Sequence, residues 1–104
     1  MKLLPEPINF EWDKGNINKN LIKHDVTNKE TEEAFNNDQK FIIEDVKHSL
    51  SEKRYMVWGI TNKQRKLSIF FTLRKNKVRI ISARDMHKKE RREYEKQIQE
   101  DSKI

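Results

Sequence analysis

Three apolar runs in the middle of the chain carry the clearest pattern of hydrophobic and polar positions. They are rich in β-branched and aromatic residues and lie at 55–60, 67–73 and 78–83. The polar segments between them are short enough to form hairpin turns. In the middle run the apolar side chains share one face, and the other face carries Ser68, Phe70, Thr72 and Arg74. The pattern therefore predicts an antiparallel meander of three strands with one partly solvated face.

Shorter elements are predicted at the start of the chain. Residues 8–12 alternate as a first strand, and Asp13-Lys14-Gly15-Asn16 indicates a turn. A helix is expected next, because Ile17, Leu21 and His24 recur at i, i+4 and i+7. This stripe would bring His24 towards the core.

A second helix is predicted by a capping box. Thr27 and Glu30 have the T-x-x-E spacing in which each side chain accepts from the other's backbone N–H. The helix would end at Asn36-Asn37-Asp38. Residues 41–43 then indicate a short strand, which is followed by a polar loop over residues 44–53.

The last element is predicted to be a helix that begins at Asp85, with Asp85 as its N-cap. It has few apolar side chains beyond Met86, Tyr94 and Ile98, so it either docks through one edge or waits for a partner. Together the elements predict an α+β fold in a single domain over residues 1–104. Its mainly antiparallel sheet would carry two N-terminal helices and a C-terminal helix.

The charge of the chain is +6 overall and is divided unevenly. Residues 1–52 contain seven basic and eleven acidic side chains, whereas residues 53–104 contain sixteen basic and six acidic ones. All seven arginines lie in the second part. Because the planar guanidinium suits phosphate, this distribution favours a polyanionic partner or an acidic protein surface.

The composition disfavours several other chemistries. Without cysteine, neither a disulfide framework nor a thiolate site can form. With only three histidines and two glycines, neither a closed zinc site nor a glycine-rich phosphate loop is expected. There is no recognisable signal peptide, and no apolar run reaches the roughly 20 residues that span a membrane. We therefore expect a cytoplasmic protein that needs no metal or other cofactor.

The basic residues suit RNA cleavage without a metal. RNA supplies its own nucleophile, the 2′-hydroxyl, so the protein needs a proton acceptor, a cation for the developing charge and a donor to the leaving oxygen. Histidine, arginine and tyrosine can fill these roles if the fold brings them together. The candidates are Lys23, His24, Arg54, Arg74, Arg84, Arg91, Arg92 and Tyr94.

Ordinary structural roles compete with this interpretation. His24 equally fits a helix histidine bonded to the backbone, and Arg54 fits an ion pair with a carboxylate. The mixed charges of residues 88–96 at i,i+3 and i,i+4 are typical of a solvated helix. Phe70 could either pack against the protein or stack on a base.

Four segments, taken in order, resemble one protein family. They are Phe10-Glu11-Trp12-Asp13 with residues 20–26, Glu52-Lys53-Arg54-Tyr55 before Trp58-Gly59, residues 80–84 (Ile-Ile-Ser-Ala-Arg), and residues 90–95 (Glu-Arg-Arg-Glu-Tyr-Glu). This order closely resembles the BrnT family of type II toxin–antitoxin toxins. The resemblance extends from about Phe10 to Tyr94.

The resemblance implies a RelE-like fold and a ribonuclease activity that arrests translation and growth. It also implies a BrnA-type antitoxin that neutralises the toxin, binds operator DNA and could form a heterotetramer with it. The family's motif positions fall on Lys23, His24, Arg54, Arg84, Glu90, Arg91 and Tyr94. One departure is Asp25, because family members usually have glycine after the histidine. Asp25 makes a tight turn at this position energetically less favourable and adds a negative charge near the proposed base.

The sequence therefore predicts a metal-independent endoribonuclease toxin with an α+β fold, in which the helices lie on one side of a mainly antiparallel sheet. Arg54 and Arg84 would bind the scissile phosphate, and Lys23 or His24 would help with proton transfer or phosphate binding. The predicted catalytic residues are Lys23, His24, Arg54 and Arg84, and the predicted RNA-binding residues are Arg74, Arg91 and Tyr94. The alternative is a non-catalytic basic module that docks an acidic antitoxin or nucleic acid.

Overall fold

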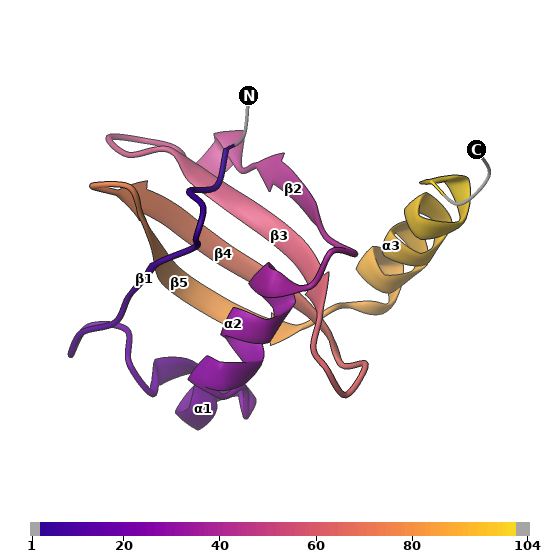
Figure 1. Cartoon of the computed structure of the whole chain (residues 1–104), viewed down its shortest axis with the longest axis horizontal. Coiled ribbons are helices and arrows are strands. Elements are labelled where there is room, and N and C mark those ends of the chain that lie inside the picture. The colour runs from indigo at the N-terminus through magenta and orange to yellow at the C-terminus, as the bar shows by residue number, and fades with distance from the viewer. Residues whose placement is uncertain (1–2, 102–104) are drawn as a thin grey trace.

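A five-stranded sheet and three α-helices are found in residues 3–101, the part of the chain that the computed structural model describes (Figure 1). The elements are β1 (Phe10–Glu11), α1 (Lys19–His24), α2 (Asn28–Asn36), β2 (Phe41–Glu44), the 3-10 helix η1 (Val46–His48), β3 (Arg54–Ile60), β4 (Lys66–Arg74), β5 (Lys77–Asp85) and α3 (Lys88–Asp101). The strand order is β1-β5-β4-β3-β2. Strands β2 to β5 pair antiparallel, and β1 lies parallel to β5. The predicted α+β fold and its meander are confirmed.

One face of the sheet is covered by α2 and the N-terminal segment, which cross in front of the strands in Figure 1. The rings of Phe35 on α2 and Phe71 on β4 meet edge to face, with their centroids 5.0 Å apart. Helix α2 lies close to β3 because Gly59 has no side chain. A Cβ at Gly59 would be 2.6 Å from the Ala34 carbonyl oxygen. The buried core of this face consists of Val26, Ala34, Phe35, Val57, Leu67, Ile69, Phe71, Val78, Ile80 and Ala83.

A smaller core on the second face anchors α3. Trp58, Met86 and Tyr94 form it, and the Tyr94 and Phe41 rings meet edge to face at 5.7 Å. The Tyr94 hydroxyl donates to the Gln39 carbonyl oxygen at 2.6 Å, and burial raises the pKa of Tyr94. Helix α3 therefore docks through one edge, and it projects away from the sheet in Figure 1. The prediction that all helices lie on one side of the sheet is wrong, because α2 packs on one face and α3 on the other.

Helix α1 borders the free edge of β5. Strand β1 pairs with only two residues of β5, Val78 and Arg79, so backbone groups further along need other partners. Side chains that precede or belong to α1 supply these partners. The contacts are Asn16 Nδ2 donating to the Ile80 carbonyl oxygen, Lys19 Nζ donating to the Ile81 carbonyl oxygen, and Asn20 Oδ1 accepting from the Ala83 N–H.

The predicted inward stripe of this helix is wrong. Ile17 and Leu21 are each 44% exposed, His24 is exposed, and Asn20 is the buried residue of α1. A strand edge offers backbone donors and acceptors, so the helix face that meets it must form hydrogen bonds. The polar face of α1 with Asn20 is therefore the buried one, although the apolar residues Ile17 and Leu21 recur with helical spacing.

The predicted N-cap of the last helix is also wrong. Asp85 is the final residue of β5, opposite Leu67, and α3 begins only at Lys88. The Glu90 carboxylate accepts from the His87 N–H at 2.8 Å, close to the start of α3. The helix begins later than predicted because β5 continues its pairing with β4.

The other local predictions are confirmed with small shifts. Thr27 and Glu30 form the capping box at the start of α2. The first strand is shorter than predicted, with two residues instead of five. The polar loop after β2 contains the short helix η1.

Candidate functional site

A row of side chains crosses the open part of the second face. The strand register places Arg54 of β3 beside Thr72 of β4, and Thr72 beside Arg79 of β5. Neighbouring strands lie about 4.8 Å apart, so the two arginine backbones are about 10 Å from each other. Because Thr72 is short, a hollow of about 180 Å³ remains over this row. We call it the arginine hollow, and its lining includes Lys19, Glu52, Arg54, Thr72, Arg74 and Arg79.

Carboxylates hold two arginines of the arginine hollow. Arg79 donates to Glu11 at 2.8 Å and to Asp13 at 2.7 Å, and Arg74 donates to Glu52 at 2.8 Å. The hydrogen bonds from Arg79 lower the pKa of Asp13, and those from Arg74 lower the pKa of Glu52. Both carboxyl groups are therefore ionised at neutral pH and offset part of the positive charge.

Arg54 differs from these two arginines. It is half-buried at the start of β3, and within residues 3–101 its guanidinium makes no hydrogen bond or ion pair. The alternative role considered for Arg54, an ion pair with a carboxylate, is therefore absent from this part of the chain. An unpaired guanidinium at a hollow can bind phosphate with two parallel hydrogen bonds, without first losing a protein partner.

Comparison with known proteins identifies the family. The family model described as "Ribonuclease toxin, BrnT, of type II toxin-antitoxin system" matches residues 12–90. This range covers more than half of the chain and includes four of the five strands. The chain belongs to the BrnT ribonuclease toxin family. A comparison with curated proteins found no match.

Arg84, at the Ser-x-Arg position of the BrnT resemblance, lies further along the same face as the arginine hollow. It donates to the Glu90 carboxylate at 2.7 and 3.1 Å and lies over the Phe70 ring, 5.7 Å from its centroid. Burial works to raise the pKa of Glu90, but hydrogen bonds from Arg84 and from the His87 N–H lower it on balance. Arg84 pairs in register with Ser68 of β4. Ser68 is four residues from Thr72 in the row of the arginine hollow, or about 13 Å along the strand.

The Lys-His pair of the BrnT resemblance lies at the far end of β5. Lys23 and His24 are exposed in the last turn of α1. Hydrogen bonds from Arg65 lower the pKa of Asp85, the last residue of β5, and the charge of His24 adds to this effect. Asp85 is six residues from Arg79, or about 20 Å along the strand. The structure therefore does not bring His24 together with the arginine hollow.

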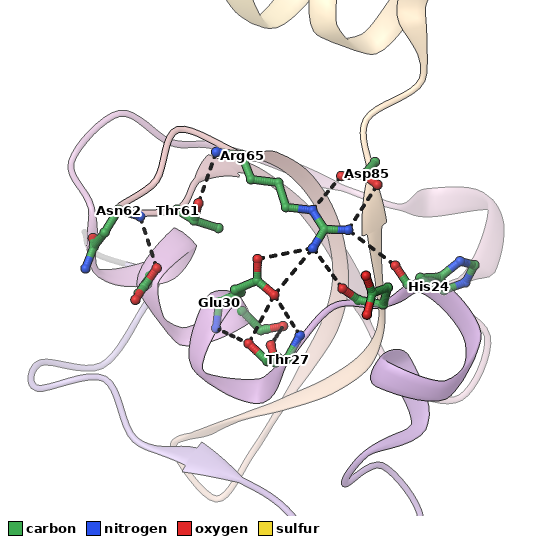
Figure 2. A network of polar contacts seen from close by, with 10 residues as sticks. His24, Thr27, Glu30, Thr61, Asn62, Arg65 and Asp85 are labelled. Carbon is green, nitrogen blue, oxygen red and sulfur yellow. Dashed lines mark hydrogen bonds and ion pairs between the residues drawn. The ribbon is translucent and has the colours of Figure 1, made fainter.

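Arg65 connects the elements around His24 (Figure 2). It donates to Asp85 at 2.7 Å and to Glu30 at 3.1 Å. It also donates to the carbonyl oxygens of His24 and Asp25, at 3.3 and 2.8 Å. One guanidinium thus ties the end of α1, the start of α2 and the end of β5 together.

Asp25 adopts the backbone conformation that favours glycine. Its φ of 56° is left-handed, and its N–H caps the end of α1. A residue with a side chain is strained in this conformation, whereas glycine adopts it without strain. The hydrogen bond from Arg65 to the Asp25 carbonyl oxygen helps to hold the turn in place.

The predicted RNA-binding residues of α3 have different surroundings. Arg91 is exposed and lines a hollow together with Arg65 and Asp85. Tyr94 is fully buried, and its hydroxyl is already bonded to the Gln39 carbonyl oxygen. Tyr94 therefore has no surface to offer to RNA in this structure.

Two basic residues of the arginine hollow were missed by sequence reasoning. Arg79 could have been found, because it alternates with Val78 and Ile80 and so lies on the solvated face. Lys19 could not, because its position depends on α1 docking against the edge of β5. That docking has no local pattern in the sequence.

Acidic residues of the first half neutralise three of the seven arginines of the second half. These ion pairs are Glu11 and Asp13 with Arg79, Glu30 with Arg65, and Glu52 with Arg74. The uneven charge of the two halves therefore does not become a uniformly basic surface. Part of the positive charge of the second half is neutralised by these ion pairs.

Residues 3–101 contain neither a helix that could span a membrane nor a cluster that could hold a metal ion. No helix there is long and apolar enough to cross a membrane. No cluster of three or more histidine, aspartate or glutamate side chains in that range could hold a metal ion.

Proposed function

We propose that this BrnT-family protein cleaves RNA without a metal ion and binds the scissile phosphate in the arginine hollow. The unpaired guanidinium of Arg54, which lines the same hollow as Arg79 across the short Thr72, carries the proposal. In this reaction the 2′-oxygen of the RNA attacks the adjacent phosphorus, and the 5′-oxygen leaves. Arg54 stabilises the negative charge that develops on the phosphate oxygens. The products carry a 2′,3′-cyclic phosphate and a 5′-hydroxyl.

Three further arginines would bind neighbouring phosphates. Arg74, Arg79 and Arg84 each hold a carboxylate, which keeps the guanidinium oriented while RNA is absent. The Arg74–Glu52 pair is the most exposed of the three, and exposed pairs contribute little to stability, so exchange of Glu52 for a phosphate costs little. Phe70 lies between Arg84 and the arginine hollow and is half-buried, so it can contact a base.

The remaining predicted residues extend this track or support it. Lys23 follows Lys19 by one helical turn and shares its face, so we assign to it a phosphate contact along the edge of β5. His24 and Arg91 lie near Asp85 and would contact RNA beyond the scissile bond. Tyr94 anchors α3 and is left out of the RNA contacts.

The proposed protein partner is a BrnA-type antitoxin. Membership of a type II toxin family supports a protein antitoxin. We propose that an acidic segment of it covers the arginine hollow and pairs with Arg54, and that the complex, a heterotetramer, binds operator DNA through the antitoxin. Free toxin would arrest growth by cleaving RNA needed for translation.

Incubation of the purified, antitoxin-free protein with RNA in EDTA tests the activity. We expect cleavage that leaves 2′,3′-cyclic phosphate ends. Arg54→Ala is expected to slow cleavage by about 10²–10³-fold, the usual loss when one donor to a developing oxyanion is removed. Arg92→Ala, an exposed arginine on α3, is the matched control and should cleave at the parental rate.

Intact RNA after this incubation would contradict the proposal. If the protein then bound RNA in a salt-sensitive way, the non-catalytic binding module would be the better description. Equal cleavage by Arg54→Ala and the parent would exclude Arg54 as the phosphate ligand. Circular dichroism of both variants excludes misfolding as the cause of any loss.

A further inference from the structure

A histidine–aspartate pair lies beside Arg54, outside the motif positions of the family. His48, the last residue of η1, has Nδ1 at 3.0 Å from one Asp45 carboxylate oxygen and 3.1 Å from the other. An ionised carboxylate can only accept, so Nδ1 carries the proton of the neutral ring and Nε2 is left as an acceptor. The His48 side chain is 58% exposed and that of Asp45 is 15% exposed. The pair thus combines a sheltered carboxylate with an accessible basic nitrogen.

Hydrogen bonds fix this pair relative to Arg54. The Asp45 N–H donates to the Arg54 carbonyl oxygen at 2.8 Å, and the Arg54 N–H donates to Ser49 Oγ at 2.8 Å. Ser49 Oγ in turn donates to the Asp45 carbonyl oxygen at 2.7 Å. The residues on both sides of His48 are therefore bonded to the backbone of Arg54 or to each other. The loop has little freedom to move away from Arg54.

His48 and Arg54 also line the same hollow. It has a volume of about 190 Å³, and Glu52 and Arg54 line both it and the arginine hollow. The charged groups that face His48 here are Lys47, Glu52 and Arg54, together with its partner Asp45. Arg74 holds Glu52 through two hydrogen bonds, so this carboxylate is already engaged. A phosphate bound to Arg54 on this side would therefore share the hollow with His48.

We propose that His48 is the general base of the cleavage reaction and that Asp45 positions it. This inference rests on the proposed ribonuclease function. His48 Nε2 takes the proton of the 2′-hydroxyl as the 2′-oxygen forms its bond to phosphorus. The bond from phosphorus to the 5′-oxygen breaks, and this oxygen takes a proton from water. His48 ends the step protonated and returns its proton to solvent.

The assignment replaces the earlier candidates for the base with one close to the phosphate ligand. His24 lies near Asp85, about 20 Å along β5 from the row that contains Arg54. Within residues 3–101, no carboxylate accepts from the His24 ring to select its tautomer. Sequence reasoning passed over His48 because an isolated histidine in a polar loop has no periodic signal.

The test compares three matched substitutions, His48→Gln, His24→Gln and His87→Gln, with the parent protein. We expect His48→Gln to lower the cleavage rate by about 10²–10⁴-fold, as loss of a general base does. The parental rate should fall as the pH drops through the range in which histidines take up a proton, and His48→Gln should lose this dependence. His24→Gln and His87→Gln should keep it.

Two controls separate catalysis from binding and from folding. A 2′-O-methyl oligoribonucleotide lacks the nucleophile, so its binding reports on the site without turnover. We expect His48→Gln to bind it with the parental affinity. Asp45→Asn, which offers an amide donor to Nδ1 and so favours the wrong tautomer, should lower the rate and alter the pH profile with unchanged binding.

The outcomes are distinct. Parental rates for His48→Gln, or loss of the pH dependence in His24→Gln instead, would overturn the assignment and leave the ribonuclease function standing. An equal loss of 2′-O-methyl RNA binding and of activity in His48→Gln would also overturn it, because His48 would then be only a binding residue. A parent protein that does not cleave RNA at all would overturn the proposed function and this inference together.

Discussion

At the scale of single residues, the partners of each arginine decide what it can do. Arg79 and Arg74 hold carboxylates, and Arg65 holds two carboxylates and two carbonyl oxygens. Arg54 makes no side-chain hydrogen bond or ion pair within residues 3–101 and is only attracted by the nearby Glu52 carboxylate. All carry the same charge, yet only an arginine without a partner binds a new anion without an exchange. Arg65 is, by the same reasoning, a structural residue.

Replacement of Arg65 by methionine tests this structural role. The variant leaves Glu30 and Asp85 without their cation and frees two carbonyl oxygens. We expect the free energy of unfolding to fall by about 1–3 kcal/mol, measured by urea denaturation. Arg92→Met removes an exposed arginine and should stay within about 0.5 kcal/mol of the parent. Equal stability of the two variants would show that the Arg65 contacts contribute nothing.

At the scale of elements, α1 is held by polar side chains rather than by an apolar face. Asn20 Oδ1 accepts from the Ala83 N–H at 3.0 Å, and Asn16 and Lys19 donate to carbonyl oxygens of β5. Side chains of α1 and of the turn before it therefore supply the hydrogen bonds that a neighbouring strand would make to β5 beyond the end of β1. This arrangement also leaves Leu21 exposed on the outer side of α1.

Substitutions on the two sides of α1 should accordingly differ in how much they destabilise the fold. Asn20→Ala leaves the Ala83 N–H buried without an acceptor, so we expect a loss of about 1–3 kcal/mol in the free energy of unfolding. Leu21→Ala should change it by less than about 0.5 kcal/mol, because Leu21 is exposed. Hydrogen exchange at the Ala83 amide should be faster in Asn20→Ala only. A larger loss in Leu21→Ala would mean that the apolar side of α1 packs inward after all.

At the scale of the whole molecule, ion pairs link the acidic first half to the basic second half. Arg79 lowers the pKa of Asp13, and Arg65 lowers that of Asp85. Burial works to raise the pKa of Glu30, but hydrogen bonds from Thr27 and Arg65 lower it on balance. A carboxyl group whose pKa is lower in the folded protein stabilises the fold above its unfolded pKa, and this contribution disappears as the pH falls.

The expected result is a loss of stability in acid. The ordinary pKa values of these groups are 3.8 for aspartate and 4.5 for glutamate, so stability should be constant above about pH 6 and fall below about pH 5. Urea midpoints measured from pH 7 to pH 3 would record it. In Arg65→Met the decline should be smaller, because Glu30 and Asp85 no longer have a lowered pKa. A parent protein that became more stable towards pH 3 would contradict this account.

Much of the fold could be predicted because its signals are local. The meander joins neighbouring strands through short turns, and the capping box joins Thr27 to Glu30 within one helical turn. The start of α3 was misplaced because Asp85 satisfies an N-cap pattern while pairing in β5. A pattern of residue types does not reveal which of two compatible local structures has the better tertiary contacts.

The arrangement of the candidate site depended on the tertiary structure more than the secondary structure did. Local patterns were enough to predict the α+β meander and its solvated face, and the motifs carried the resemblance to the BrnT family. The tertiary structure was needed to show that Glu11 neutralises Arg79 across 68 positions. It also places His48 in one hollow with Arg54, whose guanidinium makes no hydrogen bond or ion pair within residues 3–101. Strand register sets these neighbours, and register results from the packing of the whole sheet. Periodicity along the chain shows which face a side chain lies on, but not which charge lies opposite it.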